Sequence, residues 1–276
     1  MLKFTTKLST FILLLVFSFT LAAQDAPSAA AVYNDALAKM KEKDYAAAFP
    51  LFEEAIAKAD STSDTGKKVI SLASKNGTSC AYRLGTAERK AKNYDTALEY
   101  FDKGIVMNDS YFGNYLGRAQ ALDGQGTDIP AAINAYVVAG DQAMATSNNK
   151  DKAPALYRKA QNFSAVSYIK EDDFESAVKY ADLYMEARPE GNDAYIAAYY
   201  KAAALNKLEK NEDALPAIQA AVAALPEDED GDKYHLLHGL VQQALGNTEE
   251  AVSAYELVVG DKYKAAAQSR IEALKQ

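Results

Sequence analysis

Apolar residues recur at steps of three and four along most of this chain, which is the spacing of one face of an α-helix. The segment 81–109 shows the pattern most clearly. Leu84 lies on a first predicted helix, and Ala97, Phe101 and Gly104 share one face of a second. No stretch shows the sustained period-two alternation of a half-buried strand. The pattern therefore predicts an all-α chain built from helix pairs.

The same pattern recurs six times. The equivalent small residue of each second helix is Ala48, Ala97, Ala132, Ala177, Ala214 and Ala251, at spacings of 49, 35, 45, 37 and 37 residues. The two long spacings leave surplus residues near 61–75 and 141–152. We expect these to be extended helices and longer connections, because neither is large enough to bury a core of its own. Asn76-Gly77 is a possible break in the first of them. A last amphipathic helix over 263–274 is expected to cap the open end of the stack.

The unit at 81–109 resembles the tetratricopeptide repeat (TPR), a helix–turn–helix of about 34 residues. It matches the TPR pattern at Leu84-Gly85 and at Ala97-x3-Phe101, and it departs where Ala81, Glu88 and Asp109 replace a Trp, a Tyr and a Pro. The resemblance implies an all-α fold, a right-handed α-α superhelix (TPR solenoid) of about six helix pairs plus a C-terminal capping helix. It covers nearly all of residues 24–276.

The N-terminus has the pattern of an export signal. The first ten residues carry two lysines and no acidic residue, and an apolar run at 11–21 precedes Ala22-Ala23. This order is typical of a signal peptide over 1–23, cleaved after Ala23. An uncleaved membrane anchor is the alternative for this segment. We expect an exported protein, in the periplasm or associated with a membrane, with no membrane span in the mature chain.

The charge balance excludes one class of partner. The chain carries 30 Lys and Arg against 38 Asp and Glu, a net charge of −8, and removal of 1–23 would take away two lysines and no acid. Phosphate backbones require a basic face, so we expect no nucleic-acid partner.

Candidate chemistry is sparse. His235 and His238, three residues apart on a predicted helix, could share a metal, but no carboxylate at helical spacing completes a set. The acidic run 227–232 fails as an EF-hand loop, because a proline and a leucine fall on ligand positions. Cys80 is the only cysteine and reads as a buried small hydrophobe. We therefore expect no catalytic residues, no metal, no cofactor and no enzymatic activity.

The TPR resemblance also implies where a partner binds. In that family the first helix of each pair lines a concave face that holds an extended peptide or a partner helix. The corresponding basic, amide and aromatic residues here are Tyr82, Arg89, Lys90, Tyr111, Asn114, Arg118, Lys159, Asn162 and Lys233. Such residues suit carboxylates and peptide backbones, although they are also ordinary solvent-facing helix residues.

The predicted function is thus a non-enzymatic exported scaffold that binds a protein or peptide partner in the bacterial envelope. Two alternatives stay open at this point. One is small-ligand, metal or enzymatic chemistry on the concave face, with His235 and His238. The other is a structural subunit of an envelope assembly complex.

Overall fold

The computed structural model describes residues 27–170, 172–189, 191 and 193–276. Within them the chain forms thirteen α-helices, one short 3-10 helix and no strand. The elements are α1 (Ala29–Lys41), α2 (Tyr45–Lys58), α3 (Asp64–Lys90), α4 (Tyr94–Met107), α5 (Phe112–Gln125), α6 (Ile129–Ala145), η1 (Lys150–Lys152), α7 (Ala153–Lys170), α8 (Phe174–Ala187), α9 (Ala194–Lys207), α10 (Asn211–Ala223), α11 (Asp232–Ala244), α12 (Thr248–Glu256) and α13 (Asp261–Leu274).

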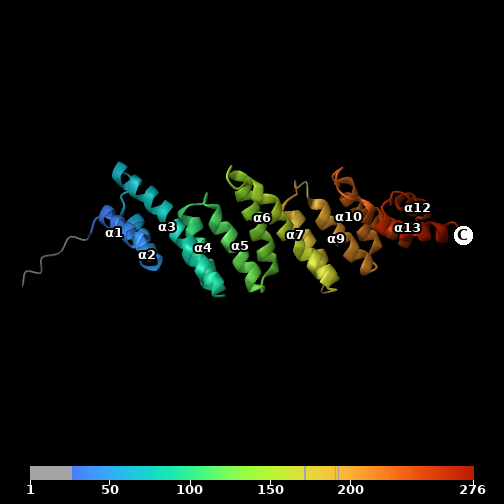
Figure 1. Cartoon of the computed structure of the whole chain (residues 1–276), viewed down its shortest axis with the longest axis horizontal. Coiled ribbons are helices and arrows are strands. Elements are labelled where there is room, and N and C mark those ends of the chain that lie inside the picture. Colours follow the sequence, from blue (N-terminus) through green and yellow to red (C-terminus); the bar gives the residue numbers. More distant parts are fainter. Residues whose placement is uncertain (1–26, 171, 190, 192) are drawn as a thin grey trace, which may run out of the picture.

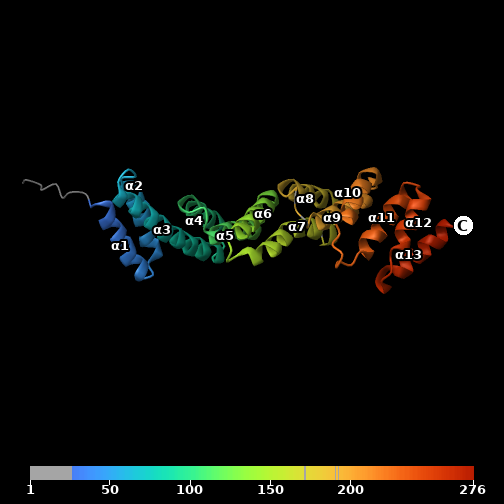
Figure 2. The same cartoon turned by 90° about the horizontal axis from the view of Figure 1, so that it is seen from above.

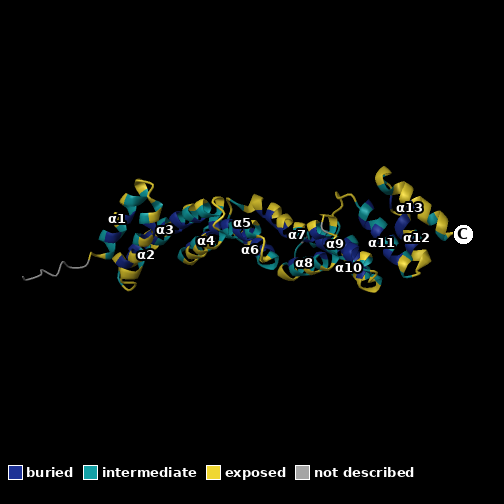
Figure 3. Ribbon diagram, turned by 90° about the horizontal axis from the view of Figure 1, so that it is seen from below, coloured by how far each residue is buried: buried dark blue, intermediate teal, exposed yellow. Residues whose placement is uncertain are grey.

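The helices stack as six consecutive pairs, and α13 follows the last pair (Figure 1). Each helix packs on the next one along the chain, and the stack is elongated in both side views (Figure 2). The buried residues follow the interior of the stack from end to end (Figure 3). The predicted all-α superhelix of six pairs with a capping helix is confirmed.

Each pair turns through one residue in the left-handed region. The turn residue has a φ between 50° and 80° in all six hairpins, and it is glycine in two of them: Lys43, Lys92, Gly126, Asp172, Glu209 and Gly246. Left-handed backbone ends a helix and reverses the chain within a few residues. The short reversal holds the two helices of a pair together, so the pair is the building unit.

Aromatic side chains join one pair to the next. Phe101 of α4 is fully buried. A Cβ on Gly85 of α3 would lie 2.8 Å from its ring, and a Cβ on Gly117 of α5 would lie 2.2 Å from it. The ring therefore occupies space that exists only because two neighbouring helices carry glycine. This explains why the spacing of small and bulky residues predicted the pairing.

The helices that pack between neighbouring pairs change halfway along the chain. First helices pack on first helices from α1 to α3 to α5, and again from α7 through α9 and α11 to α13. Between α5 and α7, both fully described, no Cα atoms approach within 8 Å, and α6 packs on α8 instead. The face made by first helices is therefore divided into an N-terminal part and a C-terminal part.

A cluster of charged and aromatic side chains lies at this change in stacking. The Arg188 guanidinium, just after α8, sits 3.4 Å from the centroid of the Tyr157 ring of α7. Its Nη atoms lie 3.3 Å from Asp141 of α6 and 3.7 Å from Asp193 before α9. The Tyr157 and Tyr184 hydroxyls donate to those two carboxylates at 2.8 Å. This Arg188 cluster ties four successive helices together.

Several local predictions can be compared with the helices. The long first helix of the second pair is confirmed, since α3 begins at Asp64 and runs for 27 residues. The break at Asn76-Gly77 is wrong: α3 is continuous, and Gly77 is buried against Met107 and Phe52. The surplus near 141–152 forms the end of α6, a short connection and η1. The predicted signal peptide, 1–23, lies outside the described residues.

No helix in the described part of the chain is both long enough and apolar enough to span a bilayer.

Candidate functional site

One face of α3 carries a continuous row of solvent-accessible side chains. Its members are three or four residues apart, except for the adjacent Tyr82 and Arg83. They are Lys68, Leu72, Lys75, Ser79, Tyr82, Arg83, Thr86 and Lys90, which we call the α3 stripe. None of its members is buried. At 1.5 Å per residue the stripe extends for roughly 33 Å, the length of about ten residues of extended peptide.

The α3 stripe is positively charged in an otherwise acidic chain. α3 contains six Lys and Arg against two Asp and Glu, whereas the whole chain has a net charge of −8. Four of the cations, Lys68, Lys75, Arg83 and Lys90, are exposed, and none forms an ion pair within the described residues. Arg83 lies 5.0 Å from the centroid of the Tyr45 ring. These cations are free to bind an anionic ligand.

Two of the predicted aromatic residues extend this surface toward α5. The rings of Tyr82 and Tyr111 meet edge to face, with centroids 5.7 Å apart. Burial raises the pKa of the Tyr111 hydroxyl, which therefore stays neutral at physiological pH. Both rings are only half-buried, so they can also contact a ligand. Lys90 is exposed at the end of the stripe.

Arg89 lies beside the stripe and not on it. It is half-buried, whereas the neighbouring Lys90 is exposed. Its Nε is buried without a hydrogen-bond partner. Its charge is felt by Tyr136 of α6, where it favours the ionised phenol. Arg89 is therefore less available to a partner than the exposed cations of the stripe.

The prediction that Asn114 contacts a partner is wrong. Its side chain is fully buried between α3 and α4. Its Nδ2 donates to the Thr78 hydroxyl at 2.8 Å, and that hydroxyl donates to the Gly104 carbonyl at 2.7 Å. A Cβ on Gly104 would lie 2.3 Å from the Asn114 amide, so the glycine makes the space for it. Asn114 joins two pairs inside the stack.

Arg118 also lies away from the α3 stripe. Its Nε donates to Asp102 of α4 at 2.7 Å. The two residues line a hollow with Tyr115 and with Val138 of α6, on the side of the second helices. The prediction that Arg118 shares a surface with Tyr82 is therefore corrected: the ion pair to α4 holds it on the other side of α5.

The remaining predicted residues belong to the C-terminal part of the first-helix face. Lys159 and Asn162 are exposed on α7. Lys233 of α11 lies 5.2 Å and 4.9 Å from the ring centroids of Tyr199 and Tyr234. Because the face is divided between α5 and α7, the structure does not bring these three together with Tyr82 and Lys90.

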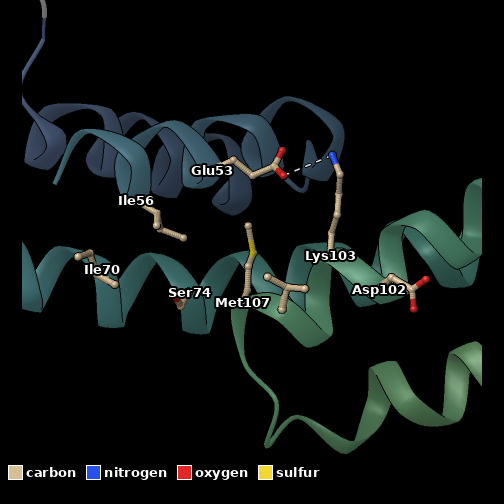
Figure 4. A pocket seen from close by; sticks show the side chains of 8 residues that line it. Glu53, Ile56, Ile70, Ser74, Asp102, Lys103 and Met107 are labelled. Carbon is tan, nitrogen blue, oxygen red and sulfur yellow. Dashed lines mark ion pairs between the residues drawn. The ribbon is translucent and has the colours of Figure 1, made fainter. Parts of the chain in front are cut away.

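A groove opens on the opposite side of α3, between α2 and α4. It has a volume of about 670 Å³ and an apolar lining that includes Ile56, Ile70 and Met107 (Figure 4). Val106 at its edge is 88% exposed. The Lys103 ammonium lies 3.3 Å from the Glu53 carboxylate across the groove. This groove can accept apolar side chains but has no preference for one sign of charge.

The described residues contain no group of three or more His, Cys, Asp or Glu side chains arranged to hold a metal ion. Burial lowers the pKa of both His235 and His238, so both imidazoles are neutral at pH 7. Neutral imidazoles suit a metal, but the nearby carboxylate of Asp232 is already bound to the backbone amides of Val259 and Gly260, at 3.0 Å and 2.7 Å.

Cys80 is buried and unpaired on α3, as predicted. Burial raises the pKa of its thiol to about 11. Only the thiolate reacts with alkylating agents, and deprotonation is thus disfavoured until the pH approaches 11. We expect native protein at pH 8 to react with iodoacetamide at least 100-fold more slowly than protein unfolded in urea. Mass spectrometry of time points checks this, and equal rates in the two states would contradict the burial of Cys80.

No protein-family model and no curated protein matches the sequence. Among solved structures, the chain is similar to YrrB, described as a TPR protein with an unusual peptide-binding site, at 16% identity over 64% of this chain and 82% of YrrB, with a TM-score of 0.34. It is similar to yeast Tom70 at 19% identity over 90% of this chain, with a TM-score of 0.39, and spans about half (53%) of that protein.

A tetratricopeptide repeat protein from Parabacteroides merdae is similar at 13% identity over 90% of this chain and 99% of its own, with a TM-score of 0.31. At these levels of identity the similarity concerns the helical repeat and does not extend to ligands.

Proposed function

We propose that this protein is a non-enzymatic scaffold that binds a protein or peptide partner through the α3 stripe and the adjoining Tyr82–Tyr111 pair. The observation that carries the proposal is the row of unpaired cations along one exposed helix face in a chain of net charge −8. Such a row attracts an acidic segment of a partner and steers it to this face, since the rest of the chain is acidic.

The spacing of the stripe fits an extended peptide. Lys68, Lys75, Arg83 and Lys90 are each separated by seven or eight residues, about 11–12 Å along the helix. An extended peptide presents side chains on one side every second residue, roughly every 7 Å. Carboxylates on one side of such a peptide, two or four residues apart, lie about 7 or 14 Å from one another, and the long Lys and Arg side chains can adjust to these distances. The Tyr82 and Tyr111 rings offer apolar contact between them.

We further propose that the protein acts after export. This part of the proposal is supported by the sequence alone, through the lysines and the apolar run of the first 23 residues. N-terminal sequencing of the protein purified from its own cells tests it. A mature chain beginning at Gln24 is expected, and a chain that retains the first 23 residues in the cytoplasmic fraction would contradict export.

Charge reversal tests the α3 stripe. We expect Lys75→Glu/Arg83→Glu to weaken binding of a fluorescein-labelled peptide of alternating Glu and Leu by about 100-fold, since each lost charge-assisted contact costs about 1.4 kcal/mol or more. Fluorescence anisotropy at two salt concentrations provides the measurement. The affinity of the unmodified protein should fall as salt rises.

A matched control separates the site from the overall charge. Lys207→Glu/Lys264→Glu makes the same change of charge at two exposed residues far from α3. This variant should bind the peptide within about threefold of the unmodified protein, because exposed charges beyond a Debye length are screened. Equal losses in both double variants, with unchanged circular dichroism, would show that the peptide responds to net charge and would overturn the site.

A photo-crosslinking residue at Ser79 extends the test to intact cells. Ser79 lies on the stripe between Lys75 and Arg83 and makes only a weak hydrogen bond, to the Lys75 carbonyl at 3.3 Å. Crosslinks should map to an acidic segment of a partner, and they should disappear in Lys75→Glu/Arg83→Glu. Crosslinks that persist in the charge-reversed protein would contradict the proposed function.

A further inference from the structure

A second groove lies near the C-terminal end, between α10 and α12. Two adjoining hollows of about 560 Å³ and 490 Å³ share Leu257 in their linings. His235 lines one hollow and His238 lines the other, so α11 forms the common floor. We call the two hollows together the C-terminal groove. Like the groove of Figure 4, it opens on the side of the second helices.

The walls of the C-terminal groove are partly apolar. Val222 and Leu225 line it from α10 and the loop that follows. Leu257 and Val259, after α12, are 56% and 71% exposed. Apolar side chains gathered around a hollow are more typical of a binding surface than single exposed ones scattered over a protein.

Acidic side chains stand at both ends of this groove. Glu227, Glu229 and Asp230 line the hollow at one end, and Glu249 and Glu250 line the hollow at the other. No Lys or Arg lines either hollow among the described residues. The segment 209–256 holds eleven Asp and Glu against two Lys. Its net charge of −9 is more negative than the −8 of the whole chain.

The two lysines of that segment do not offset the acidity of the groove. Lys233 stacks over Tyr199 and Tyr234 on another face, and Lys210 lies in a separate hollow at the start of α10. Of the acids that line the groove, Asp230 interacts electrostatically with Lys262 at the start of α13, and Asp232 is bound to backbone amides. The other four, Glu227, Glu229, Glu249 and Glu250, form no ion pair among the described residues. They give the groove a negative potential that attracts a cationic group.

The distribution of charge distinguishes between possible ligands. A metal ion needs several oxygens around one point, and the described residues provide no such cluster. The acids here are divided between two ends, on either side of Leu257. This arrangement suits an elongated ligand with cations at both ends and apolar groups between them.

We propose that the C-terminal groove binds a Lys- and Arg-rich amphipathic helix of another protein. The partner helix would lie along α11, with its apolar side chains on Val222, Leu257 and Val259 and its cations at the two acidic ends. α11 has 13 residues and is about 20 Å long, which sets a partner helix of three to four turns.

This inference is independent of the α3 stripe. The two surfaces lie at opposite ends of the solenoid, on opposite sides of its helices, and attract ligands of opposite charge. A protein with both would hold an acidic segment at one end and a basic helix at the other. The two sites share no residue. Binding at each can therefore be measured separately, and a negative result at one site says nothing about the other.

Synthetic peptides in titrations with the full chain test the inference. The probe is a fluorescein-labelled peptide of about 14 Lys and Leu residues with leucine at helical spacing, and its control is a scrambled peptide of the same composition. We expect the amphipathic peptide to bind at least tenfold more tightly than the scrambled one. Equal binding would show nonspecific attraction between opposite charges and would overturn the proposal.

Protein variants locate the binding. Leu257→Ser/Val259→Ser and Glu249→Gln/Glu250→Gln should each weaken the amphipathic peptide at least tenfold. Glu186→Gln/Glu272→Gln, which removes the same charge at exposed residues elsewhere, should leave the affinity within twofold. A groove variant that binds as well as the unmodified protein would contradict the assignment. Circular dichroism melts confirm that each variant is folded.

Two further outcomes would also overturn it. One is calcium binding by calorimetry that competes with the peptide, which would make the acids a cation site. The other is a salt-sensitive dimer in sedimentation that is lost in Leu257→Ser/Val259→Ser, which would make the occupant a second copy of this chain. Lys75→Glu/Arg83→Glu should bind the amphipathic peptide normally, which separates this result from that of the proposed function.

Discussion

Replacing Phe101 by alanine is expected to lower the free energy of unfolding by about 3–5 kcal/mol, the range for truncation of a fully buried aromatic residue. The ring lies against Gly85 of α3 and Gly117 of α5, so its removal empties a site shared by the second and third pairs. Neighbouring glycines have no side chains that could move to fill the cavity. The loss should therefore fall near the upper end of the range.

Urea denaturation followed by circular dichroism measures this change. The matched control is Val106→Ala on the same helix, because the Val106 side chain is 88% exposed and its truncation should cost less than 0.5 kcal/mol. In a stack whose pairs contact only their neighbours, loss of this joint should also make the unfolding transition broader. A Phe101→Ala variant as stable as Val106→Ala would contradict the packing described between α3, α4 and α5.

Replacing Arg188 by methionine is expected to cost about 2 kcal/mol, because the substitution removes a cation–π contact with Tyr157 and a charge-assisted hydrogen bond to Asp141, whose side chain is partly exposed to solvent. Methionine keeps much of the volume over the Tyr157 ring, so the loss reports on the guanidinium itself. The effect should be local, since Asp141, Asp193 and Tyr157 belong to the helices on either side of the joint.

Hydrogen exchange provides the sharper measurement. Amides of α6 to α9 should exchange faster in Arg188→Met, while those of α1 to α4 should keep their rates. Arg158→Met, on the exposed face of α7, is the control and should change neither stability nor exchange by more than the experimental error. If both variants behaved alike, the Arg188 cluster would have no role in holding the joint.

The sequence predicted the pairing of helices because bulky and small residues alternate between neighbouring helices. Ala97 and Phe101 of α4 are both buried, in the places that the spacing indicated. The six units and the capping helix could be predicted for the same reason. The continuity of α3 through Gly77 could not, because the glycine there serves packing against Met107 and does not break the helix.

Asn114 shows why the candidate site was harder to predict. A polar residue on a first helix is usually exposed. Whether it is instead buried depends on whether the neighbouring helices offer space and a hydrogen-bond partner, which the sequence alone does not show. Here Gly104 leaves the space, and Thr78 supplies the hydrogen bond. A glycine in α4 that faces an asparagine in α5 was the available signal, but it could not be interpreted without the crossing of the two helices.

The α3 stripe, in contrast, is visible in the sequence as a regular spacing of cations, but the alignment to the repeat pattern did not include most of them. Lys68, Lys75 and Arg83 recur at seven- and eight-residue steps, but they lie mostly outside the segment that matches the repeat pattern. Arg118 was placed by register on the first-helix face, whereas the ion pair with Asp102 turns it to the other side. The repeat register identifies the helix on which a residue lies. The direction of its side chain depends on the neighbouring side chains.

The exchange of partners between α5 and α7 has a consequence for the path of the solenoid. At the other junctions between pairs in the described part of the chain, the first helices pack on one another and the second helices do not, whereas at this junction α6 packs on α8 and α5 stays apart from α7. The side on which neighbouring pairs converge is therefore exchanged between the third and fourth pairs. The curvature of the solenoid should change direction there, so that two partners bound to the first helices of the two halves would face different directions.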